Sequence, residues 1–341
     1  MATLKDVARL AAVDPSTVSR VLRGDPVQAV RPETRDRILA ASQRLRYRPN
    51  AMARGLRTRR TDTLGLIIPS LENVGFSEVT HGIQAAAAAA GRLVVVVEAE
   101  ALERSGVAAD VEELYSRLIT DGRVDGLIVA FATLDDHLVS KLAERGIPLV
   151  LVNRRTAGVH GSVVVEDERG SALAVEHLVG LGHRRIGYVG LAAETDTARR
   201  REHGFRSAIQ AAGLTVEAGW VVSGAPTLAG GQSAVEPVVR LSPAARPTGM
   251  FVASLLGAIG VLAGMRAGGL SVPDEMSVIA FNDHELAGHL DPPLTTVRMP
   301  NLQMGAQAVS LLLDAIDGQD QRDVVIDEPP VIVVRGSTRA I

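Results

Sequence analysis

The chain starts with TLKDVARLAAVDPSTVSRVLRG, in which apolar and polar residues alternate at helical spacing. The first apolar residues recur every three or four positions, at Leu4, Val7, Ala8 and Ala11. This spacing predicts a helix that ends near Ala11, with Thr3 as its N-cap and Asp6 in the capping-box position.

A second helix is predicted directly after a tight turn. Asp14 can cap its N-terminus, and Pro15 suits the first helical position because proline has no N–H to leave unpaired. Val13 can pack against Val18 across this helix start. One face of the helix is apolar, at Val18, Val21 and Leu22. The other face carries hydroxyl groups and guanidinium groups, at Ser16, Thr17, Ser19, Arg20 and Arg23.

Such a helix pair is typical of a helix-turn-helix, in which the second helix reads DNA. Short hydroxyl donors and forked arginines are the side chains that contact phosphates and base edges. The alternative is a pair of surface helices that cap a larger domain. The segment that follows favours the first interpretation.

A third helix is predicted in RPETRDRILAASQRLRY, where Pro32 can begin it. Its core face is expected to consist of Ile38, Leu39 and Leu45. The next segment, RPNAMARGLRTRRTD, is basic and too short to hold a helix by itself. It can fold on contact with DNA, with Arg54 at a phosphate and Leu56 as an apolar wedge in the minor groove.

From Thr63 onward, short apolar runs alternate with helical patterns. The runs are LGLIIPS, RLVVVVEAE, DGLIVAFA, PLVLVNR, SVVVED, RRIGYVG, TGMFVAS, MSVIAFND and PVIVVRGS. Continuous rather than alternating apolarity predicts strands that are buried on both faces, as in parallel sheets covered by helices. So many strands predict an α/β body of two sheets, with a ligand at the carboxyl ends of the strands.

Charge divides the chain unevenly. The first 60 residues contain 14 Lys and Arg and 5 Asp and Glu, whereas the remaining residues contain 22 and 34. A basic head on an acidic body is typical of a polyanion-binding module joined to another domain. The chain has no Cys, no signal-peptide pattern at its start and no apolar run of transmembrane length, so we expect a cytoplasmic protein.

Motifs for catalysis are missing from the sequence. GLGHRRIGYVG does not place its glycines in the dinucleotide-binding register, and there is no P-loop or nucleophile elbow. HELAGH resembles a zinc motif, but its histidines, His284 and His289, are five residues apart and do not share a helix face. We therefore expect no enzyme activity, no cofactor and no metal.

Several motifs together resemble the LacI/GalR family of bacterial transcription regulators. They are TLKDVARLAAV, PSTVSRVL, RPETRDRILAA, YRPNAMARGLR, TLGLIIPSLEN, VDGLIVA, GIPLVLVNR, VVVEDERGSALAVEHLVGLGHRRIGYVG, VIAFND and DPPLTTVRMP. They run from the N-terminus almost to the C-terminus. The resemblance implies a three-helix head, a hinge helix and a two-lobed receptor like a periplasmic binding protein.

The resemblance also implies domain limits. We expect a DNA-binding domain over 1–48, a hinge over 49–60, and an effector-binding and dimerisation domain over 61–341. The first lobe is expected over about 61–157 and 291–320, and the second over 158–290 and 321–341. Chain crossings between the lobes are expected at the turn-rich segments 156–162, 288–293 and 318–323.

Family positions give the predicted DNA contacts. The base-reading residues would be Pro15, Ser16 and Arg20. Backbone contacts and neighbouring positions would be Thr3, Lys5, Thr17, Ser19, Asn50, Ala53 and Arg54, and Leu56 would be the intercalating residue. Two residues depart from the family pattern, since Ala12 replaces a glycine and Asp14 replaces a serine. If Ala12 needs a positive φ, alanine costs about 1 kcal/mol there.

Family positions also give an effector site, made of Asn73, Phe76, Asn153, Arg201, Ser254 and Asn282. Ser254 and Asn282 stand where the family usually has Asn and Asp, and Arg201 is the only charged residue of the six. Aromatic residues make up only 3% of the chain, although aromatic faces commonly hold sugars. We expect a sugar or sugar derivative, with a small anionic metabolite paired with Arg201 as the alternative.

The predicted function is a homodimeric repressor of a catabolic operon that binds a palindromic operator, because one head reads too few base pairs for useful specificity. A regulator with a degenerate cleft under the control of a protein partner is a second hypothesis. A solute-binding protein or an enzyme is a third, and the basic head and the missing motifs disfavour it.

Overall fold

The computed structural model describes residues 2–23, 30–47, 60–100 and 111–341. The chain forms two compact units, Met1–Thr61 and Asp62–Ile341, which we call the head and the body. The body contains two mainly parallel sheets covered by helices, so the predicted α/β class is confirmed.

The head contains the helices α1 (Leu4–Ala11), α2 (Pro15–Arg23) and α3 (Pro32–Arg44). Its buried core consists of Val7, Ala8, Ala11, Val18, Val21, Ile38 and Ala41. The prediction for Leu39 was wrong, because this side chain is 39% exposed. Ala41 takes its place, since residues three apart on a helix share a face and adjacent residues do not.

The turn between α1 and α2 has a left-handed backbone. Thr3 and Asp6 form the predicted capping box at the start of α1. At its other end Ala12 has φ 49° and ψ 50°, a conformation that glycine adopts more readily than alanine. Arg37 of α3 donates from Nε to the Ala11 carbonyl at 3.0 Å and so helps to satisfy the end of α1.

Replacing Ala12 with glycine is expected to stabilise the head by about 1 kcal/mol, because it removes the left-handed strain of a Cβ atom. The same change at Ala40, an exposed residue inside α3, should cost about 1 kcal/mol. Hydrogen exchange of the α1 and α3 amides measures both effects. Destabilisation by Ala12→Gly would contradict the assignment of strain to this turn.

The first sheet of the body contains six parallel strands in the order β11-β5-β4-β3-β1-β2. They are β1 (Thr63–Ile68), β2 (Leu93–Glu98), β3 (Leu127–Val129), β4 (Leu149–Val152), β5 (Ser162–Val164) and β11 (Val324–Val325). The helices α5 (Ser77–Ala89), α7 (Val111–Thr120), α8 (His137–Glu144) and α13 (Asn301–Ile316) cover it, and η1 (Val74–Phe76) precedes α5.

The second sheet has the order β12-β10-β9-β8-β6-β7, and only β12 is antiparallel to its neighbour. Its strands are β6 (Ile186–Gly190), β7 (Val221–Ser223), β8 (Gly249–Val252), β9 (Ser277–Phe281), β10 (Thr295–Arg298) and β12 (Val331–Val333). Its helices are α9 (Asp167–Gly180), α10 (Asp196–Ala211), α11 (Leu228–Val239) and α12 (Leu255–Ala267), with the short turns η2 (Ala218–Trp220) and η3 (Glu285–His289).

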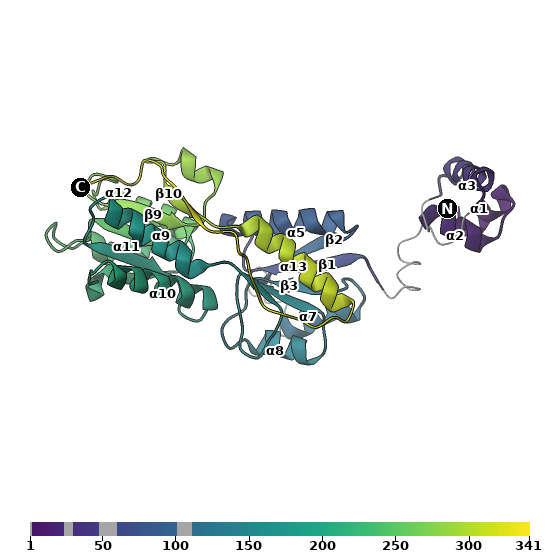
Figure 1. The fold of residues 1–341 in the computed structure, drawn as a ribbon, viewed down its shortest axis with the longest axis horizontal. Coiled ribbons are helices and arrows are strands. Elements are labelled where there is room, and N and C mark those ends of the chain that lie inside the picture. The colour runs from purple at the N-terminus through teal and green to yellow at the C-terminus, as the bar shows by residue number, and fades with distance from the viewer. Residues whose placement is uncertain (1, 24–29, 48–59, 101–110) are drawn as a thin grey trace. The chain divides into compact units, whose positions relative to one another are not determined.

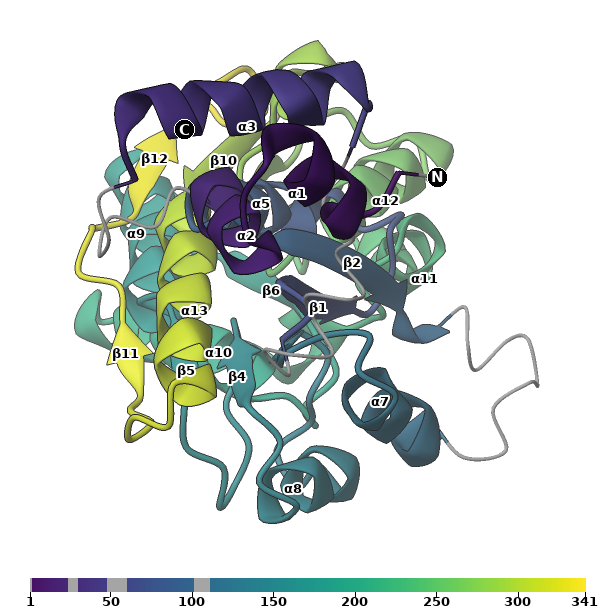
Figure 2. The ribbon, with the colours of Figure 1, turned by 90° about the vertical axis from the view of Figure 1, so that its right-hand side faces the viewer.

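The predicted lobe limits need correction. The segments 158–290 and 321–341 were assigned to the second lobe, but β5 and β11 lie side by side in the first sheet (Figure 2). The segment 291–320 was assigned to the first lobe, but β10 pairs with β9 in the second. The crossings therefore follow β5, β10 and β11. The turn-rich segment 156–162 misled the prediction because it leads from β4 to β5, two neighbouring strands of one sheet.

Helix α13 returns the chain to the first lobe after β10, where it lies alongside α5 (Figure 1). Glycines allow the close approach, since a Cβ atom on Gly305 would lie 2.2 Å from the Val79 carbonyl oxygen. Both lobes thus consist of segments that are distant in the sequence.

Candidate functional site

The structure confirms the two faces that the sequence predicted for α2, one apolar and one polar. Ser16 is exposed, and Arg20 is half-buried one turn later on the same face. Arg20 donates to Ser16 from Nε to the carbonyl and from Nη2 to Oγ, at 3.4 Å in both cases. The opposite face carries Val18 and Val21, which are buried in the head core. Polar side chains of α2 thus line a face that the head core leaves uncovered.

Asp14 caps α2 in place of the serine that the family usually has. The Ser16 backbone N–H donates to Asp14 Oδ1 at 2.7 Å. The hydrogen bonds from Ser16 lower the pKa of Asp14, so the carboxylate stays ionised at the positive end of the helix. Asp14 therefore preserves the start of α2 and accepts, rather than donates, hydrogen bonds.

The other predicted DNA contacts divide into three groups. Thr3 and Lys5 are exposed at the start of α1. Pro15, Thr17 and Ser19 are half-buried in α2. The predicted hinge contacts lie outside the described residues; they are Asn50, Ala53, Arg54 and Leu56.

Four of the six predicted effector residues lie at the ends of short elements in the body. Asn153 follows β4 and Asn282 follows β9, and both have a left-handed backbone with φ of 67° and 70°. Ser254 caps α12 by accepting from the Gly257 N–H at 3.2 Å. Asn73 caps η1 by accepting from the Gly75 N–H at 3.1 Å.

The lobes approach each other at η1. A Cβ atom on Gly75 would lie 3.1 Å from Asn73 Oδ1 in the first lobe and 3.2 Å from Asn282 Nδ2 in the second. Val74 packs against the hydrophobic cluster of the second lobe. Phe76 is only 8% exposed and packs in a hydrophobic core. Asn73 and Asn282 are therefore brought together, whereas the ring of Phe76 is occupied by packing.

Arg201 is the most buried of the predicted effector residues, at 4% exposed. Its Nε donates to Asp167 Oδ1 and its Nη1 to the Ala253 carbonyl, both at 2.7 Å. The guanidinium carbon lies 3.9 Å from the centre of the Phe281 ring. None of the six predicted residues is acidic. Arg201 nevertheless has a carboxylate partner, Asp167, which the prediction missed.

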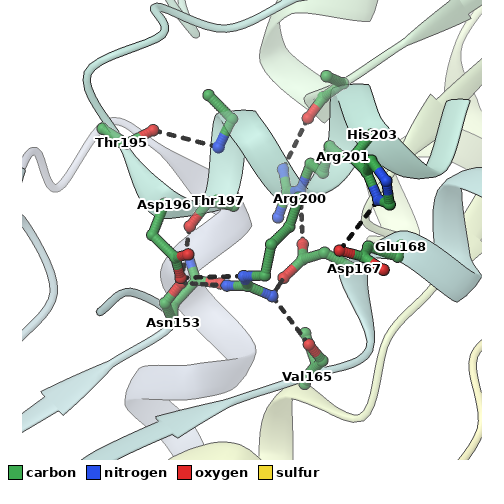
Figure 3. Close-up of polar contacts among 12 residues, drawn as sticks. Asn153, Val165, Asp167, Glu168, Thr195, Asp196, Thr197, Arg200, Arg201 and His203 are labelled. Atoms are coloured by element: carbon green, nitrogen blue, oxygen red, sulfur yellow. Dashed lines mark hydrogen bonds and ion pairs between the residues drawn. The ribbon is translucent and has the colours of Figure 1, made fainter. Parts of the chain in front are cut away.

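Asp167 also binds Arg200, and the two arginines and this carboxylate form what we call the Asp167 cluster (Figure 3). Arg200 further donates to Asp196, to the Val165 carbonyl at 3.0 Å and to the Asn153 carbonyl at 3.2 Å. A helix of the second lobe thereby holds the end of β4 in the first lobe. The cluster connects the predicted effector arginine to the contact between lobes.

Arg154, next to Asn153, is a further residue that the sequence prediction missed. Its Nη1 donates to the carbonyls of Phe131 at 2.5 Å and Ala132 at 3.2 Å, after the end of β3. Its Nε is buried and has no hydrogen-bond partner in the described part of the chain. Burial lowers the pKa of Arg154 to about 10, and repulsion by Arg201 adds to the effect.

Asp283, which follows Asn282, is held by hydrogen bonds to residues of the second sheet and of the segment after it. It accepts from Thr296 at 2.6 Å, from Arg298 at 2.7 Å and from Arg335 at 2.8 Å. Burial opposes its ionisation, but these hydrogen bonds outweigh burial and lower the pKa of Asp283. The carboxylate thus ties the ends of β9, β10 and β12 together and fixes the loop that carries Asn282.

A cavity of about 490 Å³ lies beside the Asp167 cluster. Its lining includes Arg155, Glu166, Glu168 and His203, and none of the six predicted effector residues. The acidic and basic side chains around it favour no single ligand charge. This cavity therefore does not coincide with the predicted effector residues.

Neither a metal site nor a membrane span is found among the described residues. No three acidic or histidine side chains gather as metal ligands there. None of the described helices combines the length and the apolar character needed to cross a bilayer. HELAGH forms η3, with His284 accepting from the Leu286 N–H at 3.2 Å.

Family models match both units of the chain. The model for bacterial regulatory proteins of the lacI family matches residues 3–50, and a periplasmic binding protein-like domain matches residues 175–338. The HTH-type transcriptional repressor PurR of Aliivibrio fischeri (strain MJ11) is 31% identical over 99% of this chain and 98% of its own length. Catabolite control protein A of Priestia megaterium is 32% identical over 99% of each chain.

Solved structures of regulators share the fold. The lac repressor dimer bound to operator and the anti-inducer ONPF is 27% identical over 99% of both chains, with a TM-score of 0.81. A complex of the transcriptional regulator CelR with cellobiose is 28% identical over 99% of this chain and 100% of that one, with a TM-score of 0.73. These proteins are regulators that bind DNA or small molecules, as the motifs predicted.

Proposed function

This chain belongs to the lacI family of bacterial regulatory proteins, and from that premise we propose that it binds a palindromic operator as a homodimer, under the control of a small molecule held between its lobes. That it is a DNA-binding transcriptional repressor and not an enzyme follows from its relatives. The observation that carries the proposal is the face of α2, where Ser16 and Arg20 project away from the head core.

Two heads are needed because a single α2 contacts too few base pairs for specificity, and a dimer matches the two halves of a palindrome. Leu56 is proposed as a wedge at the centre of the operator, flanked by Arg54 and Ala53, with Asn50 at the backbone. Such a repressor acts in the cytoplasm. Its targets are proposed to be catabolic genes, and a sugar or sugar derivative is the effector that its likeness to the CelR–cellobiose complex supports.

Operator selection from random DNA with the full chain tests the proposal. We expect an imperfect palindrome, and log affinity should fall with log salt at a slope of about −5 to −9, since about six to ten phosphates are neutralised. Enrichment of single, asymmetric half-sites would contradict the dimeric operator.

Replacing Arg20 with alanine is expected to relax the preference at one base position of each half-site and to cost about 1–3 kcal/mol of binding free energy, through the loss of a bidentate base contact. Arg9→Ala is the control, because Arg9 lies on α1 and pairs with Asp6. This control should keep the base preference. An unchanged preference in Arg20→Ala would show that another residue reads the base.

A further inference from the structure

We propose that the effector carries a carboxylate or phosphate group that pairs with Arg154 of the first lobe and Arg201 of the second. This inference rests on the proposed function, because it names the ligand class of the same site. It also brings in a contact residue, Arg154, that is absent from the six predicted positions.

The first argument is the unpaired state of Arg154. In the described part of the chain it makes an ion pair with no carboxylate, and its hydrogen bonds go only to two backbone carbonyls. Its Nε is buried without a partner. Asp136 and Asp196 lie within electrostatic reach, but Asp136 accepts from the N–H groups of Thr133 and Val139, and Asp196 pairs with Arg200. Arg154 is half-buried with its Nε fully buried, and a cation so withdrawn from water is costly without a carboxylate partner unless an anion joins it.

The second argument concerns Arg201 on α10 of the second lobe. Thr197, one turn before Arg201, donates from Oγ1 to the carbonyl of Asn153, the residue before Arg154, at 2.7 Å, so both arginines lie near this contact between the lobes. The two guanidinium groups come from different lobes, and they repel each other. Asp167 engages Nε of Arg201 and the Ala253 carbonyl engages Nη1, but Nη2 has no hydrogen-bond partner among the residues that the structure describes. An anion between the two groups would replace their repulsion with charge-assisted hydrogen bonds. It would also hold the lobes together.

The third argument concerns the rest of the ligand. At η1 the neutral amides of Asn73 and Asn282 flank Gly75 from opposite lobes. Amide groups both donate and accept, so they suit hydroxyl groups. A ligand with hydroxyl groups and one acidic group suits both the amides and the two arginines. Sugar acids and sugar phosphates share this chemistry.

Matched ligands test the inference on the full chain. Calorimetric titration would compare glucose with glucuronate and glucose 6-phosphate, galactose with galacturonate and galactose 6-phosphate, and ribose with ribonate and ribose 5-phosphate. We expect an anionic member of one set to bind at least about tenfold more tightly than its neutral sugar. The carboxylate and phosphate members of that set identify which anion is used.

Arg154→Gln and Arg155→Gln form the matched pair of variants. Arg154→Gln should weaken binding of that anion at least about tenfold and leave binding of the neutral sugar nearly unchanged. Its melting temperature without ligand should equal or exceed that of the wild type, because it loses a half-buried charge that has no carboxylate partner. Arg155→Gln alters a half-buried residue that lines the neighbouring cavity, and it should bind the anion normally.

Four results would overturn the inference. They are equal binding of neutral and anionic members, no binding of any anionic member at millimolar concentration, unchanged anion affinity in Arg154→Gln, and loss of affinity in Arg155→Gln alone. Operator binding of the same preparations is measured separately. If operator binding persists while any of these results is obtained, the ligand class is wrong and the proposed function stands.

Discussion

Replacing Asp167 with asparagine is expected to lower the free energy of unfolding of the body by about 3–5 kcal/mol. Asp167 is fully buried, and its two carboxylate oxygens accept from Arg200 and Arg201, which are themselves largely buried. The asparagine side chain has almost the same shape but no charge. Two buried guanidinium groups would lose their shared counter-charge, and the amide would present donors to donors.

Urea unfolding measures this loss through the fluorescence of Trp220, the single tryptophan, which is buried in the second lobe. The control is Glu168→Gln at the next position, because Glu168 is exposed and, within the described part of the chain, its ion pair is with His203 on the surface. An exposed pair contributes at most about 1 kcal/mol. Similar losses for the two variants would contradict the special role of the Asp167 cluster.

Replacing Gly204 with alanine should destabilise the body by about 2–3 kcal/mol through overpacking. Gly204 lies on α10 where this helix crosses the start of α9. A Cβ atom there would lie 2.3 Å from the Glu168 carbonyl oxygen and 2.6 Å from the Glu168 Cα. Since both are backbone atoms, α10 must move away from α9. That movement also separates Arg200 and Arg201 from Asp167, so operator release by an effector should weaken.

Gly180→Ala is the matched control in the last turn of α9. A Cβ atom on Gly180 would have no neighbour within 4 Å, so alanine should stabilise the helix by about 0.5–1 kcal/mol. Urea unfolding compares the two variants. If Gly204→Ala proved as stable as the wild type, α9 and α10 would have to pack less closely than the structure shows.

Local patterns were sufficient to predict the head. The capping box at Thr3, the proline at the start of α2 and the spacing of Val18 and Val21 all involve residues within a few positions of each other. The left-handed turn at Ala12 could be expected from the family pattern. The prediction that Leu39 faces the core was wrong because two adjacent apolar residues, Ile38 and Leu39, do not show by themselves which of them is buried.

In the body, long apolar runs identified strands but not their partners. All nine predicted runs contain strands, whereas three strands were missed: β7 and β10 because they are short and partly polar, and β11 because it has only two residues. Which lobe a strand joins depends on its partner, as with β11 and β5, whose paired residues Val324 and Val163 are distant in the sequence. The lobe limits were wrong for that reason.

The sequence by itself determined the family, the helices of the head and the strand ends that carry Asn153, Ser254 and Asn282, because these follow from local spacing and motif. Only the tertiary structure decided the charge around Arg201. Asp167 lies 34 residues away in sequence from the arginine that it binds. Whether a charge withdrawn from water is paired depends on the groups that folding places around it. Folding places Asp167 beside Arg201, but it leaves the Nε of Arg154 without a partner in the described part of the chain.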